Sequence, residues 1–437
     1  MDQFFKISQR GSSLRQEFIA ALTTFATMSY VLAVHPSVLA DAGMDRATMI
    51  TCTALAAGIF SILMGVMANL PIAQAPGMGS NALFAYTIIL VMGVPWQAAL
   101  GLTFWSGVIF FLMTVTGVRR LLLEAFPNDL KTALTVGIGL FLMFIGLKNA
   151  GIVVAAPAPV LIAVGDLKNP AVLLAAIGVP AMVLLAHKKV PGGILMVIAA
   201  ITAIGWFIPN SSGGTLTAVP DAIVSKPVSS TSLFMAFDLG YLWKNFAFAF
   251  PVLLSLVFID LFSSLVAIRA MCIRAGISEG ANNSKPIYRA LAADAIATIG
   301  ASAIGTSTTN VYGESAAGIE SGGRTGLTAI FVGLFFLLAL FVNPLLMIIP
   351  AHATAPALIL IGILMFTEVR HIQFDNLALA GPAILCMILM MVTSISDGLA
   401  LGLISYVIIR VLSGQVFKVS PMSWLLAASF GLYYLLI

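Results

Sequence analysis

The sequence predicts an all-α polytopic membrane protein, and three observations support this fold class. Of the 437 residues, 60% are hydrophobic and only 9% are charged, whereas a soluble domain carries roughly a quarter charged residues. The mean hydropathy is +1.07. Runs such as 47–70 and 325–351 contain no charged residue, and about 20 apolar residues in a helix suffice to cross roughly 30 Å of hydrocarbon. A transmembrane β-barrel would instead show short alternating segments.

Cysteine usage and charge argue against several other classes of protein. Cys52, Cys272 and Cys386 are isolated from one another and from histidine, so we expect no disulfide, no metal site and no cofactor. The formal net charge of +4 is spread through the predicted loops, which membrane orientation explains without a nucleic-acid partner. Residues 1–18 are polar and basic and lack a signal-peptide cleavage site, so we expect a cytoplasmic amino-terminal tail.

Fourteen apolar segments divide into two groups of seven. The first group lies at 17–40, 47–70, 79–93, 96–118, 130–148, 169–187 and 190–208. The second lies at 245–268, 289–308, 313–322, 325–348, 352–367, 376–394 and 396–413. Residues 209–244 between them are rich in Ser, Thr and Gly and too few for an independent domain, so we interpret them as an extracytoplasmic linker.

These segments define the expected organisation of the chain. Residues 1–208 form a first repeat and residues 245–413 a second. Residues 414–437 form a cytoplasmic or interfacial segment, because their last apolar stretch, 424–437, is short for a span. Since each group holds an odd number of crossings, the second repeat is inverted relative to the first.

The positive charges predict the orientation of the chain. With the amino terminus in the cytoplasm, sixteen of the 21 Lys and Arg residues fall on the cytoplasmic side, as the positive-inside rule requires. The other five are Arg46, Lys148, Lys168, Lys226 and Lys244. We therefore expect both termini in the cytoplasm.

The third and tenth segments are too short to cross the bilayer and contain helix breakers. Two prolines and two glycines between 71 and 79 precede a half-helix that begins near Asn81. Six glycines between 305 and 326 interrupt a stretch rich in Thr and Ser, where a half-helix begins near Glu314. Irregular backbone at membrane depth must face protein or a water-filled cavity. Such paired discontinuous helices are typical of a transporter's binding site.

Asn81 and Glu314 are therefore the first candidate ligands, at helix amino termini that carry unpaired N–H groups. Asn81 offers a donor and an acceptor, while Glu314 accepts from a ring N–H or, when protonated, donates to a ring nitrogen. This combination suits a heterocycle with mixed edges. The alternative is that both residues only stabilise helix ends. For Glu314 we favour a functional role, because placing a carboxylate at membrane depth costs about 3 kcal/mol and such residues are usually functional.

Two further acids lie within predicted spans. Asp260 has eight uncharged residues on either side and is a functional candidate, with a structural partnership as the alternative. Asp294 lies close to the cytoplasmic basic residues, and both roles stay open for it. Because burial favours the neutral form of a carboxyl group, the buried acids Asp260 and Glu314 predict proton coupling. Glu320 and Arg324, four residues apart, predict a local ion pair or helix-end contact.

Four stretches carry a family resemblance: EFIAALTTFATMSYVLAVHP, APGMGSNALFAYT, FIDLF and GTSTTNVYGESAAGIESGGRTGLTA. Through them, essentially the whole chain resembles the nucleobase–cation symporter family 2 superfamily, in particular its hypoxanthine-adenine-guanine permease group. The resemblance implies a seven-plus-seven inverted repeat in which a core domain holds the substrate and moves against a gate domain. It also implies a homodimer.

The resemblance also implies a set of site residues. The substrate-binding residues would be Asn81, Asp260, Ser264, Gly313 and Glu314, and the proton-coupling residues Asp260 and Glu314.

The sequence departs from the group at three positions. The group usually reads DLFDT where this chain has Ser263 and Ser264, so the second acid is missing and Asp260 and Glu314 must hold the proton. His35 replaces the usual Asn before a proline, and we expect it to be a hydrogen-bonded structural imidazole.

The predicted function is secondary active import of adenine, guanine or hypoxanthine by proton symport across a bacterial inner membrane. The partners are a purine nucleobase, a proton, membrane lipid and a second copy of the chain. A uracil or xanthine permease is the nearest alternative. Inorganic-anion carriers resemble the same architecture, but Glu314 would repel an anion. A channel gives no reason for two broken helices, and no nucleophile, metal spacing or nucleotide loop indicates an enzyme.

Overall fold

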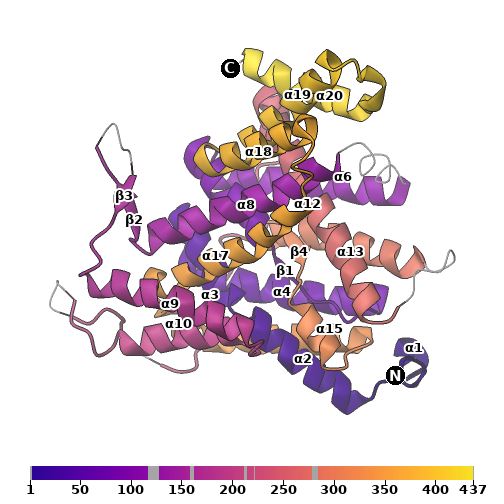
Figure 1. Cartoon of the computed structure of the whole chain (residues 1–437). Helices are drawn as coiled ribbons and strands as arrows, with labels where there is room; N and C mark the ends of the chain where they lie inside the picture. The colour runs from indigo at the N-terminus through magenta and orange to yellow at the C-terminus, as the bar shows by residue number, and fades with distance from the viewer. Residues whose placement is uncertain are drawn as a thin grey trace.

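The computed structural model describes residues 2–116, 127–157, 162–210, 214–220, 222–277 and 284–436, and most of its elements are helices (Figure 1). In chain order the helices are α1 (Asp2–Phe5), η1 (Ser8–Arg10), α2 (Leu14–Met28), α3 (Val31–Asp41), α4 (Arg46–Ala68), α5 (Met78–Ala82), η2 (Leu83–Val91), α6 (Trp96–Thr116), α8 (Asn128–Asn149), α9 (Pro170–His187), α10 (Gly193–Ile204), α11 (Tyr241–Lys244), α12 (Phe246–Arg274), α13 (Ser284–Ile304), α14 (Ser315–Glu320), α15 (Gly326–Leu338), η3 (Ala339–Val342), α16 (Asn343–Met347), α17 (Ala351–Phe366), η4 (Thr367–His371), α18 (Leu377–Val392), α19 (Ile395–Leu412), η5 (Val416–Lys418) and α20 (Pro421–Leu436). The strands are β1 (Gln74–Pro76), β2 (Val153–Ala155), β3 (Ile162–Val164) and β4 (Thr309–Val311). Arg119 and Arg120, two of the residues that the sequence places on the cytoplasmic side, lie outside the described residues.

Within the described residues, ten helices are long and apolar enough to cross a membrane. They are Leu14–Asp41, Arg46–Ala68, Trp96–Thr116, Asn128–Asn149, Pro170–His187, Phe246–Arg274, Lys285–Ile304, Gly326–Met347, Ala351–His371 and Ile395–Leu412. Shorter apolar helices are Met78–Val91, Gly193–Ile204, Leu377–Val392 and Pro421–Leu432. The prediction of a mostly helical, multi-pass membrane protein is therefore confirmed. The predicted number of fourteen spans is not, because only ten of the described helices are long enough.

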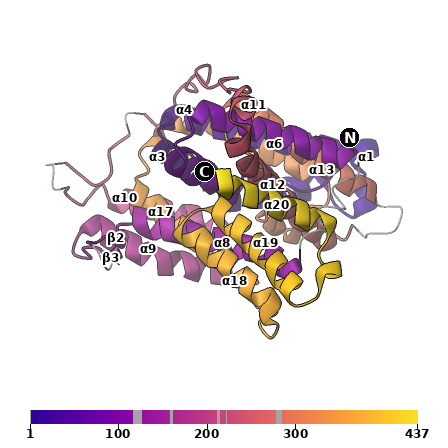
Figure 2. The ribbon, with the colours of Figure 1, turned by 90° about the horizontal axis from the view of Figure 1, so that it is seen from above.

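The long helices pack into two bundles. The first bundle contains α2 to α6 and α12 to α16, and the second contains α8 to α10 and α17 to α19. Seen from above, α4, α6 and α13 lie on one side of the molecule, and α8, α9 and α18 lie on the other (Figure 2). Small residues allow close helix packing inside the first bundle, because a Cβ on Gly65 or on Gly326 would collide with the other's backbone.

Two side-chain hydrogen bonds join the bundles at one end of α8. Asn149 Nδ2, at the end of α8, donates to Asp41 Oδ2 at 3.3 Å and to Tyr86 Oη at 3.4 Å. Tyr86 Oη donates in turn to Asp41 Oδ2 at 2.7 Å. Asp41 ends α3 and Tyr86 lies in η2, so this cluster connects the first bundle to the second.

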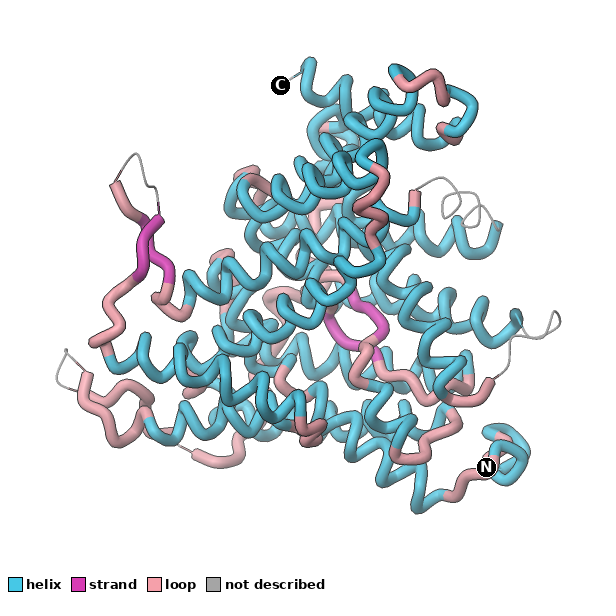
Figure 3. The backbone as a smooth tube through the Cα atoms, viewed as in Figure 1, coloured by secondary structure: helices cyan, strands magenta, loops and turns pink. Residues whose placement is uncertain are grey.

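A short antiparallel strand pair lies in the middle of the molecule (Figure 3). Strands β1 and β4 pair with Gln74 opposite Val311 and Pro76 opposite Thr309. Each strand directly precedes a short helix, α5 or α14. The two stretches that contain the predicted helix breakers therefore each include a short strand, and the hydrogen bonds of the pair satisfy backbone groups inside the bundle.

Both ends of the described chain pack against other helices. Phe5 and Ile7 are buried against Leu327, so the expected amino-terminal tail covers the start of α15. At the other end, Tyr434 Oη donates to Asp397 Oδ1 at 2.6 Å. Because this contact joins the last turn of α20 to the first turn of α19, α20 runs back along α19.

Of the two contacts predicted for Glu320 and Arg324, the structure shows the helix-end contact and not the ion pair. Glu320 Oε1 instead accepts from Arg274 Nη1 of α12 at 3.2 Å. Arg324 Nη1 donates to the carbonyl oxygens of Ile319 at 2.6 Å and Gly323 at 2.8 Å. Helix α14 ends at Glu320, so the four-residue spacing does not place the two side chains on one helical face. Arg324 therefore makes the helix-end contact that was the alternative prediction.

Candidate functional site

The β1–β4 pair fixes where the two short helices of the site begin. Gly77 N donates to Thr308 O at 2.9 Å, and Tyr312 N donates to Ala73 O at 3.1 Å. Tyr312 Oη also donates to Pro76 O at 2.6 Å. A Cβ on Gly77 would collide with the Asn310 side chain, so this close approach requires glycine. Asn81 then follows in α5, and Gly313 and Glu314 stand directly before α14.

Glu314 lies beside open space and is held by a tyrosine from another helix. Its Oε1 accepts a hydrogen bond from Tyr30 Oη at 2.7 Å. Tyr30 lies at the break between α2 and α3, in the first predicted span. Gly313 is exposed, and apart from its two chain neighbours no described residue has an atom within 4 Å of a Cβ built on it. A ligand at Gly313 could therefore reach the Glu314 carboxylate.

Asn81 is fully buried, yet neither its Oδ1 nor its Nδ2 has a hydrogen-bond partner among the described residues. The side chains of Asn81 and His35 lie close enough to interact by hydrogen bonding, although the geometry between them is not that of a regular hydrogen bond. His35 Nε2 is itself 2.7 Å from Thr306 Oγ1, which fits the structural role expected for His35. Because nearly all buried amides are hydrogen-bonded, the unpartnered Asn81 favours a ligand contact over helix capping.

Asp260 belongs to a separate polar group behind β4. Its Oδ1 accepts from Thr308 Oγ1 at 3.1 Å. With its amide group oriented to satisfy its neighbours, Asn310 Nδ2 donates to Asp260 Oδ1 at 3.1 Å. Asp294, which interacts electrostatically with Asp260, accepts from Gln74 Nε2 of β1 at 2.8 Å. The strand pair thus links the buried acids Asp260 and Asp294. Asp260 is bonded to β4, whereas Glu314 is bonded to Tyr30.

The two serines after Asp260 differ in environment. Ser263 is exposed and its Oγ donates to Ile259 O of the same helix at 2.7 Å. Ser264 is fully buried, and its hydroxyl has no partner among the described residues. Ser264 therefore stays a candidate ligand, whereas Ser263 bonds its own helix.

Sequence reasoning missed Tyr30, Thr308, Asn310 and Gln74 as neighbours of the candidate acids. Tyr30 sits in an apolar run, where a tyrosine usually reads as a packing residue. The run STTN at 307–310 was a usable signal, because four polar residues within a span need partners.

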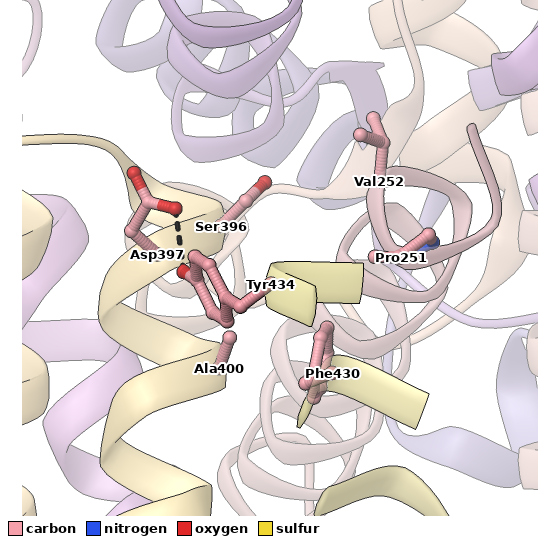
Figure 4. Close-up of a pocket in the computed structure, with 7 residues that line it drawn as sticks. All are labelled: Pro251, Val252, Ser396, Asp397, Ala400, Phe430 and Tyr434. Atoms are coloured by element: carbon pink, nitrogen blue, oxygen red, sulfur yellow. Dashed lines mark hydrogen bonds between the residues drawn. The ribbon is translucent and has the colours of Figure 1, made fainter. Parts of the chain in front are cut away.

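The pocket in Figure 4 lies away from these residues, between α12, α19 and α20. It is lined by Pro251, Val252, Ser396, Asp397, Ala400, Phe430 and Tyr434. Its volume of about 10 Å³ is no larger than the space for one water molecule. An apolar groove of about 290 Å³ between α9 and α10 contains none of the candidate residues.

Comparison with known proteins adds sequence relatives over the whole chain. The model of a permease family matches residues 15–397. Adenine permease AdeP of Escherichia coli (strain K12) is 36% identical over 422 residues, which cover 96% of this chain and 93% of that protein. Guanine/hypoxanthine permease PbuG of Bacillus subtilis (strain 168) is 37% identical over 450 residues, covering 100% and 99%.

Solved structures share the fold at much lower identity. The transmembrane domain of the cyanobacterial bicarbonate transporter BicA has a TM-score of 0.64 at 16% identity, covering 89% of this chain and 97% of that one. Murine Slc26a9, an anion transporter in an inward-facing state, has a TM-score of 0.64 at 11% identity, covering 92% and 69%. At such identities the likeness concerns the fold alone.

Proposed function

This chain belongs to the permease family of nucleobase–cation symporters, and from that membership we propose that it imports purine nucleobases such as adenine, guanine or hypoxanthine. It is a transporter rather than an enzyme. The observation that supports this cargo best is the Glu314 carboxylate beside the open space at Gly313. A carboxylate accepts from a ring N–H of a purine, whereas it repels the anions that carriers of the same fold bind.

The proposal extends to the coupling ion and to the moving parts. Glu314 and Asp260 exchange the proton that is carried with the purine. The first bundle is the core domain, which holds Asn81, Asp260, Ser264, Gly313 and Glu314, and the second bundle is the gate domain. The occurrence of a strand followed by a short helix once in each half of the chain supports a seven-plus-seven inverted repeat.

The proposal also includes the repeat boundaries, the oligomeric state and the orientation in the membrane. The repeats are 1–208 and 245–413, joined by the extracytoplasmic linker 209–244. The protein is a homodimer in the bacterial inner membrane, with both termini in the cytoplasm. Helix α20 runs back along α19. The side of the membrane on which the carboxy terminus lies can be tested by labelling a cysteine introduced there.

Transport by the purified protein in liposomes tests the function. We expect uptake of labelled adenine, guanine or hypoxanthine when the external medium is acidic, and excess unlabelled purine should compete. A protonophore should abolish accumulation, while removal of sodium should have no effect. Preferential uptake of uracil, xanthine, sulfate or bicarbonate would contradict the assignment to adenine, guanine or hypoxanthine, and sodium dependence would contradict proton symport.

Replacing Asn81 by Ala should weaken purine binding by about tenfold or more, because one or two hydrogen bonds to the ring are lost. The melting temperature should change little, since the Asn81 amide makes no regular hydrogen bond to the protein. Calorimetric titration with purine and thermal unfolding measure the two effects.

Asn343→Ala is the matched control for this test. Asn343 is also buried, but its Nδ2 donates to Ala47 O at 3.4 Å. We expect this variant to lose stability and to keep its affinity for purine. An Asn81→Ala protein with a lower melting temperature and unaltered affinity would identify Asn81 as a helix cap.

A further inference from the structure

We propose that Tyr30 is a positioning residue for transport: its hydroxyl holds the ionised Glu314 carboxylate in place until a substrate N–H or a proton takes over. The proposal rests on the proposed function and assigns a role to the break in the first span. The Tyr30 proton stays on its own oxygen throughout, because the hydroxyl donates a hydrogen bond and transfers nothing.

The local backbone explains how Tyr30 reaches the site. Helix α2 ends at Met28 and α3 begins at Val31, so Ser29 and Tyr30 stand between two helices. Ser29 N closes α2 by donating to Phe25 O at 2.8 Å, and Tyr30 O accepts from Val34 N at 3.0 Å to start α3. Only 2% of Tyr30 is exposed, so its ring is fixed by packing.

The contact itself has the geometry of a strong hydrogen bond. The Tyr30 Oη to Glu314 Oε1 distance is 2.7 Å, and a hydroxyl bonds an ionised carboxylate more strongly than a neutral acid. Thr27, one turn before Tyr30, lies with its Oγ1 3.5 Å from Glu314 O. The end of α2 therefore contacts both the side chain and the backbone of Glu314.

Other charged groups near α14 are engaged elsewhere. Helix α14 packs against α2 and α12. Glu17 of α2 accepts from the backbone N–H groups of Arg324, Thr325 and Thr328. On α12, Asp260 accepts from Thr308 and Arg274 pairs with Glu320. The remaining charged residues of these two helices, Arg15 and Arg269, are exposed.

The neighbouring tyrosine also differs from Tyr30. Tyr312, two residues before Glu314, donates to Pro76 O at 2.6 Å and so stabilises the turn. Tyr30 is therefore the hydroxyl that is directed at the carboxylate.

This arrangement predicts a shift in the pH dependence of uptake. Tyr30→Phe keeps the ring and removes only the hydroxyl. Without this donor the ionised form of Glu314 is less stable relative to the protonated form, so Glu314 stays protonated to a higher pH. The midpoint of the pH profile should therefore move upward by about one unit. A role in packing alone would leave the midpoint where it is.

Uptake into liposomes over a series of external pH values measures this midpoint for the wild type and for Tyr30→Phe. Tyr434→Phe is the matched control, because Tyr434 Oη also donates to a carboxylate, that of Asp397 at 2.6 Å (Figure 4), in a pocket lined by none of the candidate site residues. We expect an unchanged midpoint in the control. An unchanged midpoint in a folded, active Tyr30→Phe protein would overturn the proposal.

A second variant covers the case in which Tyr30→Phe does not fold. Glu314→Asp shortens the acid by one methylene and withdraws it from Tyr30 while keeping a titratable group. It should move the midpoint in the same direction, and Tyr30→Phe added to it should cause no further shift. Two independent, additive shifts would contradict a direct contact.

A measurement without substrate separates this proposal from the proposed function. The infrared carboxyl band of Glu314, identified by its absence in Glu314→Gln, can be titrated in the purified protein without any purine. Tyr30→Phe should raise the titration midpoint of this band by about one pH unit. This result would support the Tyr30 role even if the purified protein failed to transport purines, and an unshifted band would overturn it even if transport were confirmed.

Discussion

Uptake of purine should fall by about 100-fold or more when Glu314 is replaced by Gln, because a charge-assisted hydrogen bond and the exchangeable proton are lost together. The amide of Gln can still accept from Tyr30 Oη, which lies 2.7 Å from the native carboxylate. The fold should therefore be kept, and the melting temperature of the purified variant should stay near that of the wild type. Initial rates of labelled adenine uptake in liposomes measure the effect.

Glu320→Gln is the control for this substitution. Glu320 ends the same short helix, but it is exposed and pairs with Arg274. Removal of this surface pair should change stability little and leave uptake near the wild-type rate. Wild-type uptake with an unchanged pH dependence in Glu314→Gln would remove Glu314 from the site.

Replacing Asp260 by Asn should uncouple the transporter. The amide mimics the protonated acid permanently, and its oxygen can still accept from Thr308 Oγ1, which lies 3.1 Å from Asp260 Oδ1. We expect binding and purine exchange across the membrane to continue, while accumulation against a gradient is lost. Counterflow with preloaded purine and accumulation driven by a pH gradient measure the two activities in the same liposomes.

Ser263→Ala is the matched control on the same helix. The Ser263 hydroxyl bonds the Ile259 carbonyl, so its removal should leave accumulation intact. If Asp260→Asn still concentrated purine at the wild-type stoichiometry, Asp260 would play no part in coupling and Glu314 would carry the proton alone.

The sequence predicts the long spans well because the bilayer imposes their length and composition. The predicted 47–70 and 352–367 correspond to Arg46–Ala68 and Ala351–Phe366. The first span is different, since 17–40 is interrupted at Ser29 and Tyr30 without a glycine or proline at the break. Pro36, the breaker that the sequence does show, lies inside α3. At this break Tyr30 contacts Glu314, a residue 284 positions away, and no local pattern encodes such a contact.

The site is predictable only in part, for a similar reason. Helix breakers and buried acids identify Asn81, Glu314 and Asp260, because both are unusual at membrane depth. The partners of these residues come from distant segments, such as Tyr30 for Glu314 and Asn310 for Asp260. Sequence spacing cannot supply such pairs.

The β1–β4 pair also constrains how the protein is made. The Tyr312 to Pro76 contact beside it joins residues 236 positions apart, so the first half of the chain leaves the ribosome long before its strand partner exists. Unpaired backbone groups in hydrocarbon cost several kcal/mol each. The newly made β1 segment must therefore remain hydrated or shielded by the insertion machinery until β4 follows. Completion of the core is thus a late, post-insertion step, and a chain that stops at the linker lacks the partner strand needed for its own third segment to settle in the membrane.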